Sequence, residues 1–441
     1  MSSQFADSRT LHSHSPHPIT LICRALRIGS AATYYLATGG LAACAIALCK
    51  SRAQGKRFFA RRFVLLLQKL GPTFIKVGQV LGTRRDVLPR VLCDELVLLQ
   101  DAVAALSPAQ AQMTLKDVYG QHLADLFERI DDYPVASGSI ACVYRARMRN
   151  GREVAIKLQR PGIQSVMSAD LTIITNIGTA LARLRVFCGI PVQEVLEHLC
   201  AAVYAQLDFA REGESLKRLH DNLAAVPRLW VPRLDEDLSR DRALVMEFIP
   251  GLDLETARQC SPAVRKKFGA SVLAAVYRMI FIDGFVHCDL HPGNLYFTKS
   301  GQVVILDAGF SMRLPERIRR LFGEFFLNMS LGRGKRCAEI VIESAAGQSP
   351  DADLEGFTVH LANLVERSSR LAAKDFSLIA FATELFDLQR RFGLQAATEM
   401  IFPLLSLLVI EGTVRDLDPD VDFQKAAEPI LTRGVFGARA G

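Results

Sequence analysis

The stretch His-Cys-Asp-Leu-His-Pro-Gly-Asn occupies residues 287–294, and Asp-Ala-Gly follows at residues 307–309. This order reproduces the spacing H-x-D-x-x-x-x-N and then D-x-G, which is typical of kinase-type phosphoryl-transfer sites. In such a site Asp289 would act on the acceptor, while Asn294 and Asp307 would supply oxygen ligands. The stretch therefore predicts a protein that binds ATP and acts on its phosphates.

Magnesium explains why these residue types occur together. Phosphoryl transfer requires positioning and charge neutralisation more than covalent help from the protein. Mg²⁺ prefers carboxylate, amide, phosphate and water oxygens, so Asn294 and Asp307 are the predicted metal ligands. Asp289 would then orient the acceptor hydroxyl or water. The mostly apolar run 302–306 is expected to be a buried strand that ends at Asp307, and a solvated loop is the alternative for this motif alone.

A second element lies upstream, where residues 154–157 read Val-Ala-Ile-Lys. This is the pattern of a strand whose lysine, here Lys157, binds the α- and β-phosphates, although a lysine after three apolar residues is also a common strand end. The stretch before it keeps the register A/G-x-G-x-x-A/G-x-V of a phosphate-covering loop and consists of Ala136, Ser137, Gly138, Ser139, Ile140, Ala141, Cys142 and Val143. Because Gly138 is the one glycine in it, we expect a stiffer loop than in ordinary protein kinases.

The lysine of such a site is normally held by a glutamate from a following helix. Glu212 is the expected partner of Lys157, with Glu214 as the fallback, and a solvated helix face is the alternative for either glutamate. Lys157 and Glu212 are 55 positions apart, so helices at 169–184 and 192–203 are expected between them. The first lobe would therefore carry an insertion.

Residues 242–249 are expected to form a strand that leads into a hinge. Backbone groups of Glu247 and Phe248 would meet the edge of adenine there, and an ordinary core strand is an equally good interpretation of this segment alone. Beyond Asp307 the apolar spacing predicts helices at 318–329, 356–371 and 376–392, and the short apolar run 402–410 is expected to be a core helix.

Residues 70–79, Leu-Gly-Pro-Thr-Phe-Ile-Lys-Val-Gly-Gln, are followed by Arg-Arg-Asp-Val-Leu-Pro at 84–89. This stretch closely resembles the K-x-G-Q signature of the UbiB/AarF (ADCK-like) atypical kinase family. The small-residue loop, residues 154–163, residues 207–212 and the run at 287–294 also occur in that family's order. The resemblance extends over residues 63–429.

The resemblance implies an α+β, two-lobed protein-kinase-like fold with a helical extension that carries K-x-G-Q and a helix-rich second lobe. It implies a membrane-associated atypical kinase or ATPase that uses ATP and Mg²⁺ in support of ubiquinone-type quinone biosynthesis. Quinone or prenyl-lipid intermediates and quinone-biosynthesis proteins would be its partners. In this family the K-x-G-Q helix faces the nucleotide site, so Lys76 and Gln79 are expected near the phosphates, where they would block a protein substrate.

Three elements depart from the family's pattern: the E-x-D element, the small-residue loop and the D-F-G element. Its E-x-D element reads Gln-Leu-Asp at 206–208, so Lys76 keeps one expected counter-charge and the self-inhibitory lock is weaker. Cys142 stands where glutamine is common, and Gly138 where alanine is common. Ala308 replaces the phenylalanine of D-F-G, which removes a packing residue but keeps the metal-binding aspartate.

A charge-free stretch near the N-terminus predicts contact with a membrane. The 22 uncharged residues 28–49 would form a helix of about 33 Å, enough for a hydrocarbon core of about 30 Å. Residues 1–62 hold nine Lys and Arg against one acid, and six of the nine follow the stretch. The positive-inside tendency then puts the folded body on the cytoplasmic face of a bacterial inner membrane, or on the matrix side of an organellar one. An interfacial or buried helix is the alternative.

The remaining composition narrows the class of protein. Because the basic excess lies outside the folded body, nucleic acid is not an expected partner. Ten cysteines without a C-x-x-C pair or zinc spacing indicate a reducing compartment, with a structural role favoured over a redox role for Cys288. Residues 1–18 predict a disordered tail, for which metal binding by its histidines and an organellar transit peptide are the alternatives.

The sequence predicts five regions: a disordered basic tail (1–27), a transmembrane or membrane-associated helix (28–49), a helical extension with K-x-G-Q (50–125), a kinase-like lobe with an insertion (126–249) and a helical lobe with the catalytic and metal-binding loops (250–441). Two rival functions remain. One is a small-molecule phosphotransferase of the aminoglycoside or choline kinase type, against which K-x-G-Q and Arg160-Pro161-Gly162 argue. The other is a nucleotide-sensing scaffold for a lipid-biosynthetic complex, without turnover.

Overall fold

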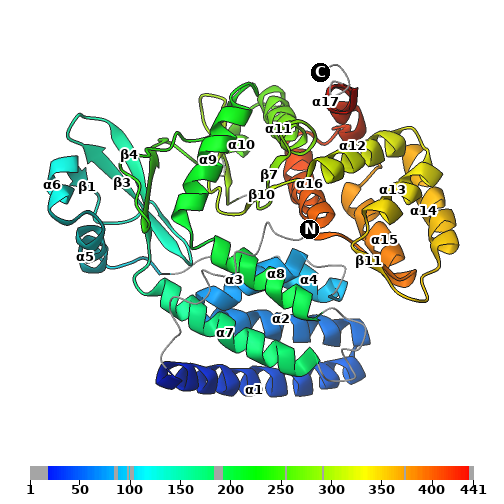
Figure 1. Ribbon diagram of the computed structural model, residues 1–441, viewed down its shortest axis with the longest axis horizontal. Coiled ribbons are helices and arrows are strands. Elements are labelled where there is room, and N and C mark those ends of the chain that lie inside the picture. The colour runs from blue at the N-terminus through cyan, green and yellow to red at the C-terminus, as the bar shows by residue number, and fades with distance from the viewer. Residues whose placement is uncertain are drawn as a thin grey trace. The chain divides into compact units, whose positions relative to one another are not determined.

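The chain forms two compact units in a computed structural model that describes residues 18–83, 88–96, 99, 104–182, 192–253, 256–290, 293–371 and 374–436. The first unit comprises Met1–Arg211 and Asp235–Met246, and the second comprises Glu212–Leu234 and Glu247–Gly441 (Figure 1). Residues 212–234, which we expected in the first lobe, cluster with the second unit. The predicted tail up to residue 17, residues 84–87 and residues 291–292 lie outside the described residues. Residues 18–27, which were predicted to be disordered, are instead the first turns of the helix α1 (Pro18–Cys49).

The first unit contains an antiparallel sheet that carries the predicted phosphate-binding strand. Its order is β1-β3-β4-β6, with β2 paired to β3, and its strands are β1 (Phe127–Ile130), β2 (Ala136–Ser137), β3 (Ala141–Met148), β4 (Glu153–Gln159) and β6 (Ala243–Glu247). In β3 the buried Tyr144 and Ala146 alternate with the exposed Arg145 and Arg147, because successive side chains of a strand point to opposite faces. Around this sheet lie α5 (Pro108–Tyr119), η2 (Gly120–His122) and α6 (Leu123–Leu126).

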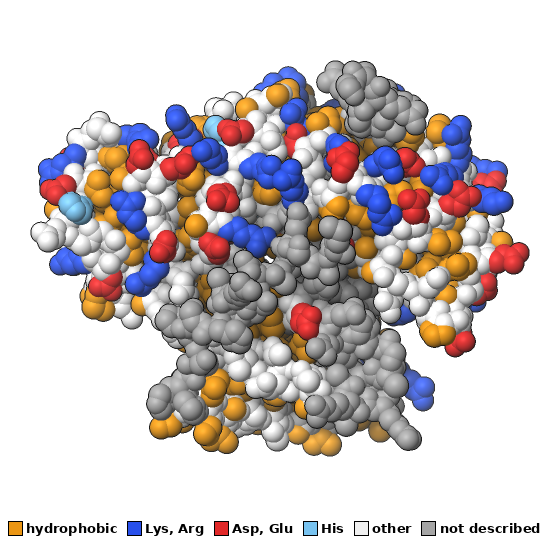
Figure 2. Space-filling view, in the orientation of Figure 1, with side chains coloured by type: hydrophobic (Ala, Val, Ile, Leu, Met, Phe, Trp, Pro, Cys, Tyr) orange, Lys and Arg blue, Asp and Glu red, His pale blue; other side chains and the backbone are white. Residues whose placement is uncertain are grey.

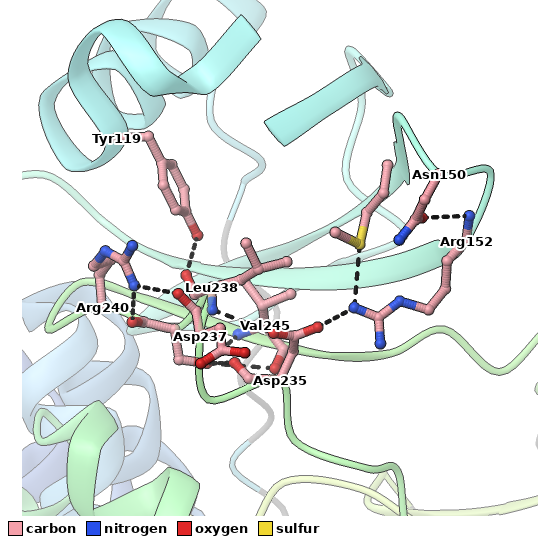
Figure 3. A network of polar contacts seen from close by, with 10 residues as sticks. Tyr119, Asn150, Arg152, Asp235, Asp237, Leu238, Arg240 and Val245 are labelled. Carbon is pink, nitrogen blue, oxygen red and sulfur yellow. Dashed lines mark hydrogen bonds and ion pairs between the residues drawn. The ribbon is translucent and has the colours of Figure 1, made fainter. Parts of the chain in front are cut away.

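Figure 3 shows how the segment that leads into β6 is fastened to this unit. The Tyr119 hydroxyl of α5 donates a hydrogen bond to the Leu238 carbonyl at 3.1 Å, and the Leu238 N–H donates to Asp235 Oδ1 at 3.2 Å. Asp235 also forms an ion pair with Arg152, which precedes β4. The contacts of Tyr119 with Leu238 and of Arg152 with Asp235 join residues far apart in the sequence and hold the segment before β6 against the sheet.

The helical extension of the first unit surrounds a separate apolar core. Its helices are α1 (Pro18–Cys49), α2 (Arg52–Leu70), α3 (Pro72–Thr83), α4 (Arg90–Leu96), α7 (Ile163–Ala182) and α8 (Val192–Ala205). The core contains Leu66, Phe74, Leu96 and Ile173. The predicted insertion helices at 169–184 and 192–203 are confirmed by α7 and α8. K-x-G-Q lies on α3, and its glycine is needed for packing, since a Cβ at Gly78 would lie 2.4 Å from Leu99 Cδ1.

A buried carboxylate links the helices of the extension. Asp170 of α7 is fully buried and accepts hydrogen bonds from Arg24 Nε at 2.6 Å and from Thr73 Oγ1 at 2.7 Å. Arg24 of α1 also donates to the Leu70 carbonyl at 2.7 Å. Because a buried charge requires a partner, this cluster fixes the start of α3 against α1 and α7.

The second unit is helix-rich and holds three small sheets. They are β5 (Leu229–Trp230), β9 (Val303–Ile305) and β8 (Leu295–Phe297) in that order, β10 (Ser311–Arg313) with β7 (Phe285–His287), and β11 (Gly347–Gln348) with β12 (Leu394–Gln395). The helices are α9 (Phe209–Leu223), α10 (Thr256–Gln259), α11 (Pro262–Tyr277), the π-helix η4 (Arg278–Asp283), α12 (Glu316–Ser330), α13 (Gly334–Ser344), α14 (Leu354–Ser369), α15 (Leu378–Arg391), α16 (Thr398–Leu417) and α17 (Phe423–Phe436). The predictions at 318–329, 356–371 and 376–392 are confirmed, and the run 402–410 is a part of α16 with many buried residues, whereas α13 was not predicted.

Candidate active site

Strand pairing in the second unit brings the two sequence motifs together. The predicted catalytic loop (hereafter the catalytic loop), which follows His287 in the motif at 287–294, begins at the end of β7. His287 of β7 pairs with Ser311 of β10, which lies shortly after the Asp-Ala-Gly loop. The Cys288 N–H donates to the Phe310 carbonyl at 2.9 Å, and the Leu306 N–H donates to the Asn294 carbonyl at 2.9 Å. The predicted buried strand is confirmed as β9, which pairs with β8 in an antiparallel hairpin. Asp289, Asn294 and Asp307 therefore lie on adjoining loops.

The Asn294 side chain is directed by the catalytic loop itself. Its Nδ2 donates to the Asp289 carbonyl at 2.8 Å, and the residue is 9% exposed. An amide that donates through nitrogen presents its oxygen as the group with metal-ligand chemistry. This orientation fits the predicted role of Asn294.

Asp307 has an unusual backbone that orients its carboxylate. Its φ of 57° lies in the left-handed region, and its Oδ1 accepts a hydrogen bond from the Gly309 N–H at 3.0 Å. Strained backbones of this kind cluster at functional sites. A Cβ on Gly309 would lie 3.1 Å from Asp307 Oδ1 and 3.5 Å from Glu212 Oε2. The carboxylate of Glu212, on α9, therefore lies beside the Asp-Ala-Gly loop.

His287 supports the loop from inside. Burial lowers its pKa, and the charges of Asp289 and Asp307 partly offset that effect. The Asp289 N–H donates to its Nδ1 at 3.1 Å, so the neutral ring carries its proton on Nε2, 3.4 Å from the Leu306 carbonyl. Burial also raises the pKa of the Cys288 thiol, which makes it a poor nucleophile and supports the structural interpretation of this cysteine.

The small-residue loop of the first unit is a tight β-hairpin. Ala136 pairs with Val143, Ser137 pairs with Cys142, and the Gly138 N–H donates to the Ala141 carbonyl at 2.9 Å. Lys157 of β4 lies directly across from Val143, and its Nζ is 5.6 Å from the centre of the Phe209 ring. The register therefore places the predicted phosphate-binding lysine beside the end of the predicted phosphate-covering loop.

Arg160 holds the small-residue loop through three hydrogen bonds, a role that was not predicted from the sequence. Its Nε donates to the Gly138 carbonyl at 2.9 Å, and its Nη2 donates to Ser137 Oγ at 2.9 Å. Its backbone N–H donates to the Ile140 carbonyl at 2.9 Å. The position of Arg160, three residues after Lys157 at the end of β4, could have suggested a contact with the small-residue loop. In the sequence this residue served only to support the family resemblance.

Ser139, in the same loop, has an unsatisfied hydroxyl. Among the buried side-chain atoms that the structure describes, Ser139 Oγ is one of three without a hydrogen-bond partner, and the residue is 1% exposed. A buried hydroxyl without a partner is costly, so it marks a place where a polar ligand group would be stabilised. A Cβ on Gly138 would meet the Ala141 carbonyl at 3.5 Å, an ordinary contact, so this stretch of backbone is open to close approach.

The other predicted residues have defined surroundings. Lys76 is 9% exposed on α3, and Gln79 Nε2 donates to the Leu99 carbonyl at 3.1 Å. Asp208, the expected counter-charge of Lys76, accepts the Arg211 N–H at 3.0 Å at the start of α9. Their roles at the nucleotide remain predictions.

At the predicted hinge, the side chain of Glu247 is held by a tryptophan that no sequence motif connects with it. Trp230 Nε1 donates to Glu247 Oε2 at 3.1 Å. The Glu247 N–H donates to the Arg233 carbonyl at 2.9 Å, so among the backbone groups of this residue the carbonyl is the better candidate for adenine. Phe248 follows directly and remains the other predicted adenine contact.

Comparison with known proteins decides the family. Residues 98–341 match the ABC1 atypical kinase-like domain, and residues 361–422 match the UbiB helical domain. A probable protein kinase UbiB of Pseudomonas fluorescens strain SBW25 is 33% identical over 387 residues, which cover 84% of this chain and 71% of that protein. The chain belongs to the UbiB family. A UbiB protein of Aeromonas hydrophila is 30% identical over 406 residues, covering 90% and 74% of the two chains.

The UbiB fold is also seen in a solved structure. A Mycobacterium tuberculosis protein in complex with erythromycin aligns with a TM-score of 0.56 at 21% identity, over 74% of this chain and 83% of that one. The predicted α+β kinase-like class with a helix-rich C-terminal region is confirmed. The UbiB helical domain comprises part of α14 together with α15 and α16.

Proposed function

We propose that this UbiB protein is a membrane-associated atypical kinase or ATPase that binds Mg-ATP and supports isoprenoid quinone biosynthesis. The observation that carries the proposal is the pairing of β7 with β10, because it sets Asp289 and Asn294 beside the Asp307 loop. The Asp307 carboxylate and the Asn294 amide oxygen are suitable ligands for magnesium. The other carboxylate, that of Asp289, is suited to orienting an acceptor hydroxyl.

The residues present fit a nucleotide and its metal. Asn294 and Asp307 would hold Mg²⁺, Lys157 would bind the α- and β-phosphates, and the Ser139 hydroxyl would gain the partner that it lacks among the described residues. Bound Mg-ATP would supply a transferable phosphoryl group. Asp289 would orient the acceptor hydroxyl or water and take up its proton. Burial keeps His287 neutral, so that it continues to accept the Asp289 N–H and holds this loop in place.

Binding can be tested through Trp230, the single tryptophan of the chain. Because its indole donates to Glu247 at the predicted hinge, we expect Mg-ATP to change its fluorescence saturably in the detergent-purified protein. A Trp230→Phe variant should lose the signal and keep Mg-dependent ATP turnover. A linear response together with absent turnover in the unmodified chain would reject the proposed function.

For the membrane, we infer that α1 is the element that binds lipid. Among the described helices, one is long and apolar enough to cross a membrane, as judged by length and composition. It is α1, over the stretch Leu21–Cys49. Its exposed side carries Ile22, Leu26, Leu41 and Leu48, with Leu41 75% exposed. Figure 2 shows hydrophobic side chains along the lower edge, where Figure 1 places α1. So much exposed apolar surface is expected to be covered by lipid.

The contacts of α1 favour a helix that lies flat on the membrane over one that spans it. The inner face packs closely on α2, where a Cβ on Gly55 would lie 2.6 Å from the Ala43 carbonyl. Arg62 of α2 lies 4.7 Å from the centre of the Tyr35 ring and donates to Thr38 Oγ1 at 2.9 Å. A spanning α1 would take α2 and its basic residues into the bilayer, at about 2.5–3.5 kcal/mol for each charge. A flat α1 places those residues near anionic headgroups instead.

Replacing Leu41 with serine should weaken binding to vesicles of anionic phospholipid about tenfold or more, since burying a leucine contributes about 1.5–3 kcal/mol. Vesicle co-sedimentation measures the change, and Met113→Ser, which alters an exposed apolar residue of α5, is the control.

Cysteine labelling tests whether α1 lies flat. In sealed vesicles an impermeant maleimide should reach the exposed Cys23 and Cys49 from the same side. Labelling from opposite sides would show that α1 spans the bilayer.

A further inference from the structure

A buried hydroxyl of the UbiB helical domain contacts the start of the catalytic loop. Ser406 of α16 is fully buried, and its Oγ donates a hydrogen bond to the His287 carbonyl at 2.9 Å. Its hydroxyl also interacts with the Cys288 thiol, where it lowers the thiol pKa against the larger effect of burial. Ser406 therefore touches the two residues that immediately precede Asp289, although it lies 119 positions away from His287.

The backbone at the start of the loop is held from three directions. Ser406 binds the His287 carbonyl, the Phe310 carbonyl accepts the Cys288 N–H, and the His287 ring accepts the Asp289 N–H. The second bond comes from Phe310, which lies between the Asp-Ala-Gly loop and β10, and the third lies within the catalytic loop itself. The contribution of Ser406 comes from a different domain of the family, so it links the position of α16 to that of Asp289.

The helix that carries Ser406 is itself firmly anchored. Glu411, one turn further along α16, is 2% exposed and accepts the N–H groups of Leu378 at 3.1 Å and Ile379 at 2.7 Å. Arg415 donates to Glu411 Oε1 at 3.1 Å and also to the Phe376 carbonyl. A carboxylate at the start of α15 compensates its unpaired N–H groups. A shift of α16 is therefore opposed by α15, and Ser406 holds a fixed position.

We propose that Ser406 is a positioning residue for phosphoryl transfer, through which the helical domain sets the pose of Asp289. The inference rests on the proposed function. In this proposal the helical domain affects the chemical step, whereas other residues bind the nucleotide. Loss of the hydroxyl would leave the buried His287 carbonyl without this donor and let the loop move, so the rate should fall while nucleotide affinity is kept.

Steady-state ATP turnover by Ser406→Ala tests the proposal. We expect kcat to fall about tenfold, with KM for ATP within about twofold of its starting value. Ser406→Thr, which keeps the hydroxyl, should recover most of kcat. The matched control is Ser344→Ala, which removes another buried hydroxyl whose hydrogen bond, to Val341 at 3.1 Å, stays within its own helix.

Hydrogen exchange supplies a readout that does not depend on turnover. The amides of Cys288 and Asp289 should exchange faster in Ser406→Ala and normally in Ser344→Ala. An unchanged kcat in Ser406→Ala, an equal loss in the control, or a rise in KM that accounts for the loss would overturn the role of Ser406 and leave the proposed function standing. If the unmodified chain shows no turnover, both proposals fail. If Ser406→Ala does not fold, Ser406→Cys, of similar size and with a weaker donor, must give a kcat below that of Ser406→Thr.

Discussion

Replacing Asp307 with asparagine should lower Mg-dependent ATP turnover by about 100- to 1,000-fold, because it removes a negative charge from the predicted metal site. The substitution is structurally mild. Asparagine tolerates a φ of 57°, and its Oδ1 can still accept the Gly309 N–H, so the loop should keep its shape. Turnover is measured as phosphate release across a magnesium titration, with thermal unfolding to confirm that the fold is retained.

The same variant separates an enzyme from a scaffold. Asp387→Asn removes a carboxylate that is exposed on α15 and pairs with Arg390, and it should leave turnover unchanged. For an enzyme, Asp307→Asn should also fail to restore quinone production in a deletion strain, whereas Asp387→Asn should restore it. Full complementation by Asp307→Asn, with turnover lost, would support the nucleotide-sensing scaffold. Unchanged turnover would remove Asp307 from the metal site.

Replacing Asp170 with alanine should destabilise the first unit by about 3–5 kcal/mol, because Arg24 would then be left without its buried counter-charge. For a unit of this size the midpoint of thermal unfolding should fall by about 6–20 °C. The loss should also loosen α3, whose Thr73 donates to the same carboxylate. Differential scanning fluorimetry measures the first effect, and hydrogen exchange across residues 72–83 measures the second.

Two control variants test whether the effect of Asp170→Ala comes from the loss of a buried ion pair. Asp117→Ala, at an exposed position of α5, should leave the midpoint unchanged. The double variant Arg24→Met with Asp170→Leu removes both charges and should be more stable than Asp170→Ala alone. If Asp170→Ala shifts the midpoint by no more than the exposed control, the carboxylate does not hold these helices together.

Local patterns in the sequence predicted the position of the candidate site because its residues lie in short motifs. The motifs at 287–294 and 307–309 are joined by a short hairpin, so their spacing alone predicted that their loops would be neighbours, as the β8–β9 pairing confirms. Apolar spacing likewise predicted α7, α8, α12, α14 and α15, since a helix buries one face at regular intervals. Among the helices of the second unit, α11, α13 and α17 were not predicted, and residues 212–234 were expected in the other lobe.

The long-range contacts that hold α3 and the catalytic loop in place could not be predicted. Arg24 and Asp170 are 146 positions apart, and Ser406 and His287 are 119 positions apart. A single hydrogen bond between distant residues leaves no periodic pattern in the chain. Nor did composition show that the uncharged segment 28–49 has one side packed against α2.

The sequence by itself predicted the chemistry proposed for this UbiB protein, through a lysine, two aspartates and an asparagine in the order and spacing of a phosphoryl-transfer site. Residue type and short-range spacing carry that information because each motif folds within a few residues of itself. Only the tertiary structure decided which groups hold those motifs in place, namely Arg160 on the small-residue loop, Ser406 on the catalytic loop and Asp170 at the start of α3. The physical reason is that burial makes these polar groups find partners wherever packing brings one within hydrogen-bond distance, whatever their separation along the chain.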